Sequence, residues 1–392
     1  MVPPIIGPPL FFVIATAMGI WMTAYVKIQI FLHSDSILVP KNRTVPNDFY
    51  NETYGNHSNV TLGNITFHYV TKGCNQEENR TVLLLLHGFL DFWYIWNRLI
   101  PKLGDDFCVI APDLRGYGNT TRPTDTADYL MTKLIGDVKE LVEYFSLNKS
   151  RKVVLVGHDW GGMISFCFAT MHEKMIDKMV IINGMHPRAF VKQLFRSVKQ
   201  MRMSWYQLPF RRPVVPEQYL KLKDFAFFNK VHKVFTQDEK EAHKYVYSLP
   251  GALTGTINYY RAFNNNSNQL SEILYRKINV TTLILWGQQD QFIMTPVARF
   301  NQEWLNNSVA IYFYGAGHFP QRECPDEVIA RIREFATNGS VPAEPPRKRW
   351  QWREWFHSYD RCRESRRPRG LWTPRIPPFI PDNAKLPNPM AE

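Results

Sequence analysis

The segment Val153-Val154-Leu155-Val156-Gly157-His158-Asp159-Trp160-Gly161-Gly162 decides the fold of this chain. Its aliphatic run predicts a strand buried on both faces, and a helical stretch from Met163 to His172 follows. Glycines on both sides of Asp159 allow a strained turn, costing roughly 1–3 kcal/mol, that raises one side chain out of the sheet. We interpret the segment as a strand-turn-helix elbow. A turn whose Asp only caps the helix is the alternative.

The composition is that of a large globular domain with additions at its ends. The chain has 392 residues, of which 45% are hydrophobic and 21% are charged. Nearly half of its net charge of +12 lies in residues 341–392, which hold 11 Lys/Arg against 6 Asp/Glu, so we expect no nucleic-acid partner for the core. The five cysteines contain no Cys-x-x-Cys pair, and we predict neither a disulfide framework nor a metal site from them.

An apolar segment lies close to the start of the chain. Lys27 is the only charged residue between residues 5 and 32, and Leu10 to Val26 approaches the ~20 residues that span a bilayer. Trp21 and Tyr25 fit an interfacial belt. A cleaved signal peptide is the alternative, but no Lys or Arg precedes the apolar run. We predict a transmembrane signal-anchor over residues 5–32.

Two features disagree about the side of the membrane on which the body lies. Lys27, Lys41 and Arg43 lie at or beyond the carboxyl end of the apolar run, with no Lys or Arg ahead of it, and favour a cytoplasmic body under the positive-inside rule. Asn-x-Ser/Thr sequons favour a lumenal, glycosylated body, and five crowd into residues 42–64. We predict a single-pass type II protein of the endoplasmic reticulum with a lumenal catalytic body. The twelve sequons begin at Asn42, Asn51, Asn56, Asn59, Asn64, Asn79, Asn119, Asn148, Asn265, Asn279, Asn306 and Asn338.

Strands and helices alternate after a polar linker at residues 33–59. Two alternating segments, 60–62 and 65–70, flank Gly63-Asn64 and predict a β-hairpin. Such alternation specifies a mostly parallel sheet covered by helices on both faces. Besides the elbow, we expect strands at 81–86, 107–111, 178–183, 281–287 and 310–314, and helices at 92–103, 132–145 and 325–337.

The alternation lapses at residues 187–268, which are rich in aromatic and basic residues and show helical patches without a clear strand. We interpret this stretch as a helical cap inserted between two core segments, 60–186 and 269–339. Residues 340–392 hold ten prolines and a basic-aromatic cluster from Arg347 to Trp355. We interpret them as a solvated tail, with contact to an acidic lipid or protein as the alternative.

Three ionisable residues follow three strands in the order nucleophile, acid, histidine. Asp159 ends the elbow strand, Asp290 follows the strand at 281–287, and His318 follows the strand at 310–314. Groups at the carboxyl ends of parallel strands converge on one crevice, so we expect the three to meet. Because the elbow carries Asp where Ser is commoner, the predicted chemistry is attack of a carboxylate on carbon.

In combination, six motifs resemble those of the α/β-hydrolase-fold epoxide hydrolases. With the apolar segment in front, the chain is most similar to their membrane-anchored, epoxide hydrolase 4-like group. The resemblance covers residues from about 60 to 338. The motifs are His87-Gly88-Phe89, Phe92-Trp93-Tyr94-x-Trp96, Pro112-Asp113-x-Arg115-Gly116-Tyr117-Gly118, Gly157 to Gly162, Leu285-Trp286-Gly287-x-x-Asp290 and Gly317-His318-Phe319-x-Gln321-x-Glu323-x-Pro325.

This resemblance implies an α/β-hydrolase fold and the conversion of a lipophilic epoxide and water to a vicinal diol, without cofactor or metal. It implies that Asp159 attacks the less hindered epoxide carbon to form an ester. His318, oriented by Asp290, would activate the water that hydrolyses the ester.

The resemblance also implies residues that bind the two developing oxyanions. Tyr206 and Tyr260 match the pair of cap tyrosines that bind the epoxide oxygen, and Tyr259 is an alternative donor. A phenol suits this role because its reference pKa of about 10 keeps it protonated near neutral pH. The backbone N–H groups of Phe89 and Trp160 would form the oxyanion hole, in which one donor is typically worth about 2.7–4 kcal/mol.

One departure and two rival functions accompany the resemblance. Leu90 stands where the family usually has Pro, which bears on the geometry of the Phe89 N–H, and Asp91 replaces the usual Glu. A haloalkane dehalogenase shares the Asp-Trp elbow, but a halide needs no acid in the cap, so the tyrosine pair favours the epoxide. A membrane-tethered binding protein of the same fold is the non-enzyme alternative.

Overall fold

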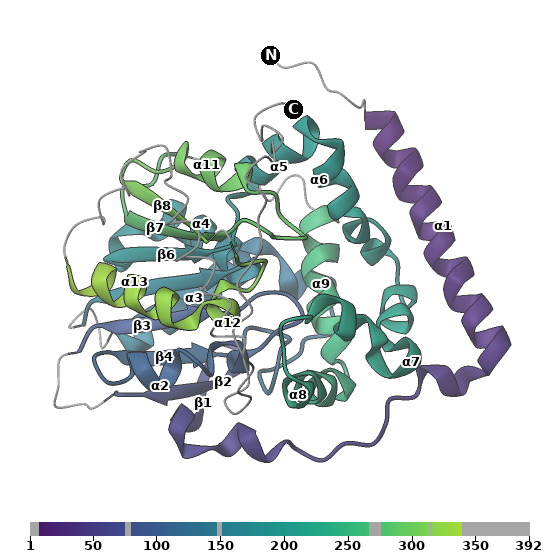
Figure 1. Cartoon of the computed structure of the whole chain (residues 1–392), viewed down its shortest axis with the longest axis horizontal. Helices are drawn as coiled ribbons and strands as arrows, with labels where there is room; N and C mark the ends of the chain where they lie inside the picture. The colour runs from purple at the N-terminus through teal and green to yellow at the C-terminus, as the bar shows by residue number, and fades with distance from the viewer. Residues whose placement is uncertain (1–7, 75–79, 147–150, 266–275, 314, 339–392) are drawn as a thin grey trace, which may run out of the picture.

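One eight-stranded sheet organises the molecule (Figure 1). The structure is a computed structural model that describes residues 8–74, 80–146, 151–265, 276–313 and 315–338. The strand order is β1-β2-β4-β3-β5-β6-β7-β8, in which β1 pairs antiparallel with β2, β2 pairs antiparallel with β4, and the remaining pairs are parallel. The strands are β1 (Asn56–Leu62), β2 (Ile65–Lys72), β3 (Val82–Leu86), β4 (Cys108–Pro112), β5 (Val153–His158), β6 (Lys178–Ile182), β7 (Thr281–Gly287) and β8 (Ser308–Phe313).

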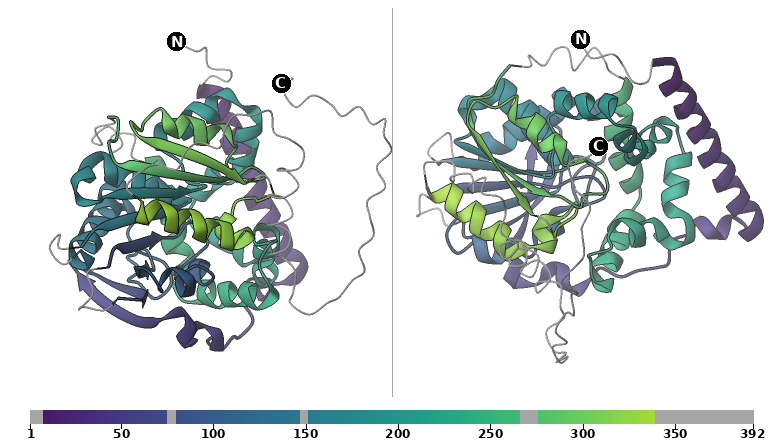
Figure 2. Two further views of the ribbon diagram at one scale, coloured as in Figure 1. Left: turned by 60° about the vertical axis from the view of Figure 1, so that its left-hand side comes forward. Right: turned by 45° about the horizontal axis from the view of Figure 1, so that its top comes forward.

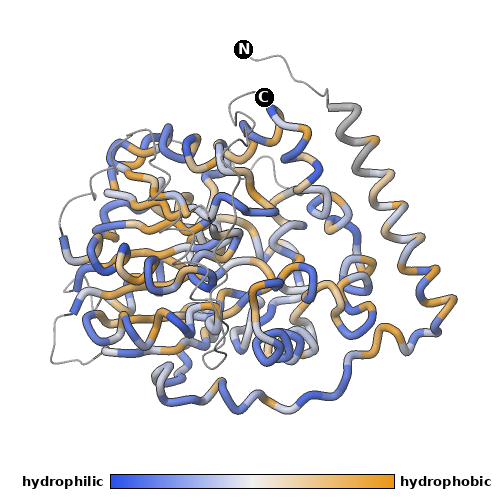
Figure 3. Tube along the Cα trace, in the orientation of Figure 1, coloured by the Kyte–Doolittle hydropathy of each residue, from blue (hydrophilic) through white to orange (hydrophobic). Residues whose placement is uncertain are grey.

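Helices cover both faces of this sheet, as the alternation of the sequence predicts (Figure 2). Successive residues of a strand point to opposite faces. Leu84 of β3 therefore packs in the core shared with α3 and α4, whereas Leu83 and Leu85 pack in the core shared with α2 and α13. Both faces of β3 are fully buried, which explains its uninterrupted aliphatic run (Figure 3). These helices are α2 (Ile100–Leu103), α3 (Met131–Phe145), α4 (Trp160–His172) and α13 (Pro325–Thr337).

A group of helices between β6 and β7 occupies the stretch predicted to be a cap. It lies beyond the carboxyl end of the sheet, so its inner side faces the ends of the parallel strands (Figure 1). Helix α7 is broken at Leu222 to Phe225, where three successive residues have positive φ. The helices are α5 (Pro187–Arg196), α6 (Val198–Met203), α7 (Val215–Val231), α8 (Gln237–Ser248) and α9 (Ala252–Asn265), with the 3₁₀ turns η7 (Trp205–Gln207) and η8 (Pro209–Arg211). Helices α11 (Pro296–Gln302) and α12 (Pro320–Glu323) follow β7 and β8, respectively.

The apolar segment near the start of the chain forms helix α1 (Pro8–His33), which runs along the outside of the cap (Figures 1 and 2). Met22 and Val26 are buried there. The ring of Trp21 makes an edge contact with Trp205 at a centroid distance of 5.8 Å.

The prediction of a signal-anchor, and with it of a single-pass type II membrane protein with a lumenal body, is wrong. Across the described residues, α1 included, no helix combines the length and the apolar character that a bilayer crossing requires. The prediction relied on the absence of charge, but Thr16, Thr23 and Gln29 lower the apolar character of the segment without adding charge.

Residues 34–55, here called the strap, connect α1 to β1 and bind the cap. The Arg43 guanidinium pairs with Asp224 at 2.5 Å and with Glu241 at 2.9 Å. Phe49 is buried among aromatic rings that include those of Phe92 and Tyr94. The predicted linker therefore has fixed contacts with both cap and core. Its regular elements are the 3₁₀ turns η1 (Asp35–Leu38), η2 (Asn47–Tyr50) and η3 (Glu52–Tyr54).

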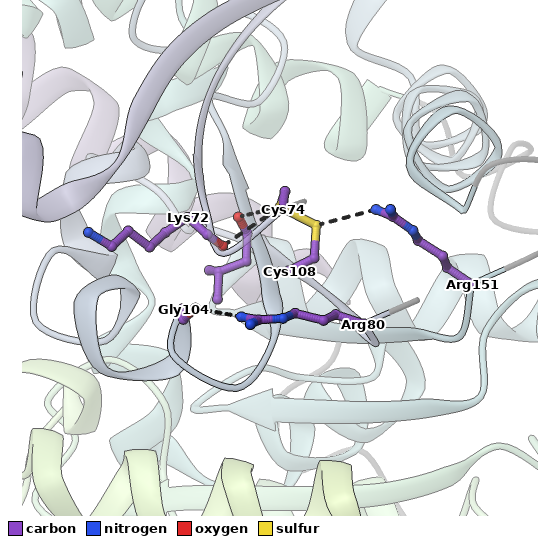
Figure 4. Close-up of a disulfide and its surroundings, with 7 residues drawn as sticks. Lys72, Cys74, Arg80, Gly104, Cys108 and Arg151 are labelled. Carbon is purple, nitrogen blue, oxygen red and sulfur yellow. Dashed lines mark hydrogen bonds between the residues drawn. A yellow bond between two sulfur atoms is a disulfide. The ribbon is translucent and has the colours of Figure 1, made fainter. Parts of the chain in front are cut away.

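A disulfide joins Cys74 and Cys108, contrary to the expectation from the cysteine spacing (Figure 4). The two cysteines are 34 positions apart, but the pairing of β2 with β4 brings their Cα atoms to 4.3 Å. Cys324 is also disulfide-bonded, whereas Cys167 is a free, buried thiol. The spacing of the cysteines in the sequence could not predict this bridge, because the two cysteines meet only when β2 pairs with β4. The predicted tail at 340–392 and its contact with acidic lipid lie outside the described residues.

Candidate active site

Asp159 occupies the tip of the elbow between β5 and α4. Its φ of 50° lies in the left-handed region that residues other than glycine rarely adopt. The turn requires glycine at position 161, because a Cβ added there would lie only 2.2 Å from the carbonyl oxygen of Leu86. In the described part of the chain the Asp159 side chain makes no capping hydrogen bond to α4, so the alternative, in which Asp159 only caps the helix, is wrong.

The structure brings the predicted acid and histidine to Asp159. His318 Nδ1 lies 2.8 Å from Asp290 Oδ2, and His318 Nε2 lies 3.5 Å from Asp159 Oδ2. All three side chains are buried. The imidazole therefore lies between two carboxylates, with one nitrogen facing each.

The charges of this triad determine its protonation. Burial alone would lower the pKa of His318, but the Asp290 and Asp159 carboxylates outweigh burial and raise this pKa to about 10. Burial alone would raise the pKa of Asp159, but the hydrogen bond and charge of His318 outweigh it, so the pKa of this carboxyl lies below its usual value. Near neutral pH the free site holds an imidazolium beside an ionised Asp159.

Asn183, which the sequence analysis did not single out, fixes the acid. Its Nδ2 donates to Asp290 Oδ2 at 2.7 Å, and its Oδ1 accepts from the Gly287 N–H at 2.8 Å. The Phe292 and Ile293 N–H groups donate to Asp290 Oδ1 at 2.7 and 3.0 Å. The carboxylate is therefore held on both oxygens. The available signal was a polar residue at the end of a strand that is otherwise aliphatic.

The cap places two phenols opposite the elbow. Tyr206 comes from η7 and Tyr260 from α9, and their hydroxyls hydrogen-bond to each other. Burial and the charge of Asp159 raise the pKa of both phenols, so both remain protonated. Tyr259, the alternative donor, turns to the other side of α9 and donates to the carbonyl oxygen of Arg115 at 2.9 Å. Of the two tyrosines on α9, Tyr260 is the one that lines the cavity.

An apolar cavity joins the elbow to the cap. Asp159 and His318 from the core and Tyr206 and Tyr260 from the cap all line it. Its remaining lining residues are apolar, so a bound ligand would be largely desolvated. These are Phe89, Leu90, Phe227, Val231, Phe292 and Phe319.

The loop after β3 delivers one of the two predicted oxyanion donors. The Phe89 N–H donates to Asp159 Oδ1 at 2.9 Å. Trp160 is the first residue of α4, where the N–H groups of the first turn have no partner within the helix. Leu90 has a φ of 57°, which a proline with its fixed φ near −65° cannot adopt. At position 90 the loop therefore has a backbone conformation that a proline at this position could not have.

Comparison with known proteins identifies relatives across this region. Residues 81–324 match the family model described as alpha/beta hydrolase fold. Mouse epoxide hydrolase 4 is 33% identical over 295 residues, which are 72% of this chain and 79% of that protein, and human epoxide hydrolase 4 is 34% identical over the same shares. Among solved structures, the epoxide hydrolase of Bacillus megaterium in complex with an inhibitor superimposes with a TM-score of 0.63 at 26% identity, covering 72% of this chain and all of that one.

Proposed function

The chain belongs to the epoxide hydrolases of the α/β-hydrolase fold, and from this premise we propose that it opens a lipophilic epoxide through a covalent ester of Asp159. One observation carries the proposal: the Asp159 carboxylate of the elbow and the two cap phenols, Tyr206 and Tyr260, line the same apolar cavity. Opening an epoxide needs a nucleophile at carbon and an acid at oxygen, and the residues that line this cavity supply both.

In the first step Asp159 Oδ2 attacks an epoxide carbon. The carbon–oxygen bond of the epoxide breaks, and its electron pair stays on the oxygen. Tyr206 or Tyr260 gives that oxygen a proton, and the imidazolium of His318 restores the proton to the phenol. The products are a hydroxy-ester of Asp159 and a neutral imidazole.

Loss of the Asp159 charge prepares His318 for the second step. The two carboxylates together raise the pKa of His318, and the ester removes one of them. The lowered pKa leaves His318 neutral, with Asp290 on Nδ1 directing the free lone pair of Nε2 towards the ester.

Water then hydrolyses the ester. His318 takes one proton from water as the oxygen of that water bonds to the carbonyl carbon of Asp159. The N–H groups of Phe89 and Trp160 bind the resulting oxyanion. Collapse releases the diol, which takes the second proton of the water, and restores the Asp159 carboxylate and the His318 imidazolium.

The origin of the oxygen atoms tests this mechanism. Enzyme in excess over styrene oxide, in ¹⁸O-water, is expected to give unlabelled diol after one turnover and to retain the label in the Asp159 carboxylate, where peptide mass spectrometry finds it. Label in the first-turnover diol would mean direct hydration, with Asp159 acting as a base.

The cap phenols separate this reaction from halide release. The double variant Tyr206→Phe with Tyr260→Phe keeps both rings but removes both acids, and we expect it to lose diol formation while circular dichroism stays unchanged. A folded double variant that still opens epoxides would refute the role of the phenols.

A further inference from the structure

The loop that carries the Phe89 N–H, residues 88–91, lies tightly against the nucleophile. A Cβ added at Gly88 would come within 2.5 Å of the Asp159 Cβ. The two residues after Phe89 are buried in the core: Leu90 is 1% exposed and Asp91 is fully buried. Leu90 holds a left-handed φ, so its conformation must be imposed by contacts on either side.

Cap helix α8 supplies these contacts through two side chains. The Tyr247 hydroxyl donates to the carbonyl oxygen of Asp91 at 2.8 Å. His243 Nε2 lies 3.1 Å from Asp91 Oδ1. Both side chains are almost completely buried, and they lie four residues apart on one face of α8.

His243 contacts Asp91 through one ring nitrogen and a backbone carbonyl oxygen through the other. His243 Nδ1 faces the carbonyl oxygen of Glu239 at 2.6 Å, while Nε2 faces the carboxylate. The Phe92 N–H is a further donor to Asp91 Oδ1, at 3.1 Å. His243 thus joins α8 to the side chain of Asp91, while Tyr247 joins it to the backbone of the same residue.

We propose that Tyr247 and His243 are positioning residues that hold the Phe89 N–H at the oxyanion of Asp159, so that the docked cap completes the oxyanion hole. The proposal rests on the proposed function, since it assigns these residues to the ester-hydrolysis step. They touch neither substrate nor the reacting atoms, and they act through Asp91 and the backbone of Leu90.

Ester formation and ester hydrolysis depend differently on the contacts of Tyr247 and His243 with Asp91, here called the clamp. Attack on the epoxide develops charge at the epoxide oxygen, which the phenols bind. Hydrolysis develops charge at the carbonyl oxygen of Asp159, which the Phe89 N–H binds. Loosening the clamp should therefore slow hydrolysis more than ester formation, and the ester should accumulate.

Tyr247→Phe is the suitable variant, because it removes one hydroxyl and keeps the ring in the core. Loss of His243 would remove a buried side-chain partner of Asp91 Oδ1 and leave a space in the core, so its effects on the loop and on stability could not be separated. Tyr245→Phe is the matched control, since Tyr245 lies on the same helix but packs against Phe49 of the strap.

The experiment combines hydrogen exchange with single-turnover kinetics on the full chain. In Tyr247→Phe we expect the amide of Phe89 to exchange at least tenfold faster than in the wild type, with no change in peptides from β5. With styrene oxide, ester hydrolysis should slow at least tenfold and ester formation less than threefold. Tyr245→Phe should match the wild type in both measurements.

Two results would overturn the proposal. One is unchanged exchange at Phe89 in Tyr247→Phe, and the other is an equal slowing of both chemical steps. A wild-type protein that forms neither ester nor diol would refute the proposed function instead. In that case the hydrogen exchange of the Phe89 amide in Tyr247→Phe would still decide whether α8 holds the loop.

Discussion

Asp290→Asn is the most informative single substitution at the triad. Asp290 accepts from four donors, which are His318 Nδ1, Asn183 Nδ2 and the N–H groups of Phe292 and Ile293. The asparagine side chain has only one oxygen, so it can accept from the backbone pair of donors or from the side-chain pair, but not from both. If that oxygen keeps the two backbone donors, the new NH₂ group faces Asn183 and His318.

The consequences follow from the partners of those two residues. Asn183 cannot flip, because its Oδ1 already accepts from the Gly287 N–H, so its Nδ2 loses a partner at a cost of about 1–3 kcal/mol. His318 must instead accept at Nδ1, which moves its proton to Nε2 and removes the lone pair that would activate water. A wrong histidine tautomer of this kind lowers turnover about 10⁴-fold in serine proteases, and we expect a loss of about 10³–10⁴-fold here.

The measurement is single-turnover mixing with styrene oxide, followed by intact-protein mass spectrometry. We expect the ester mass to persist in Asp290→Asn and to decay rapidly in the wild type. Asp105→Asn, a change at an exposed carboxylate, serves as the control. If Asp290→Asn hydrolyses its ester within threefold of the wild-type rate, the assignment of Asp290 as the residue that orients His318 is incorrect.

Three further predictions concern the loop, the disulfide and pH. Leu90→Pro should lower both turnover and the free energy of unfolding, the latter by roughly 1–3 kcal/mol, because proline cannot adopt a φ of 57°; higher diol production would contradict this. Cys74→Ser with Cys108→Ser should lower the free energy of unfolding in urea by about 2–4 kcal/mol, and an unchanged midpoint would argue against the bridge. The folded pKa of His318, about 10, exceeds its unfolded value of about 6.5, so its contribution to stability is complete below pH 6.5 and is lost as the pH rises through 10. His318→Gln should remove that decline from urea titrations at pH 6, 8 and 10.

The sheet and the triad were largely predictable because they depend on local patterns. An aliphatic run between turn residues marks a buried strand, and β5 and β7 appear where such runs predict them. Parallel strands bring their carboxyl ends to one edge, so Asp159, Asp290 and His318 could be brought together from their order alone.

The supporting residues were not predictable in the same way. Asn183 belongs to no motif, and its role becomes visible only when β6 lies beside β7. His243 and Tyr247 depend on how α8 docks on the core, a contact that spans more than 150 positions of sequence. Helix α1 was misassigned because a run without charge resembles a membrane span, while the cap surface that receives it lies far along the chain.

The strap imposes an order on folding during synthesis. Arg43 pairs with Asp224 and Glu241, which follow it by 181 and 198 positions. At a synthesis rate of about 5–20 residues per second, the ribosome needs roughly 10–40 s to make the second partner. Until then the apolar surface of α1 around Met22 and Val26 has no cap to cover it. The segment translated early is thus among the last to find its partners in the folded protein.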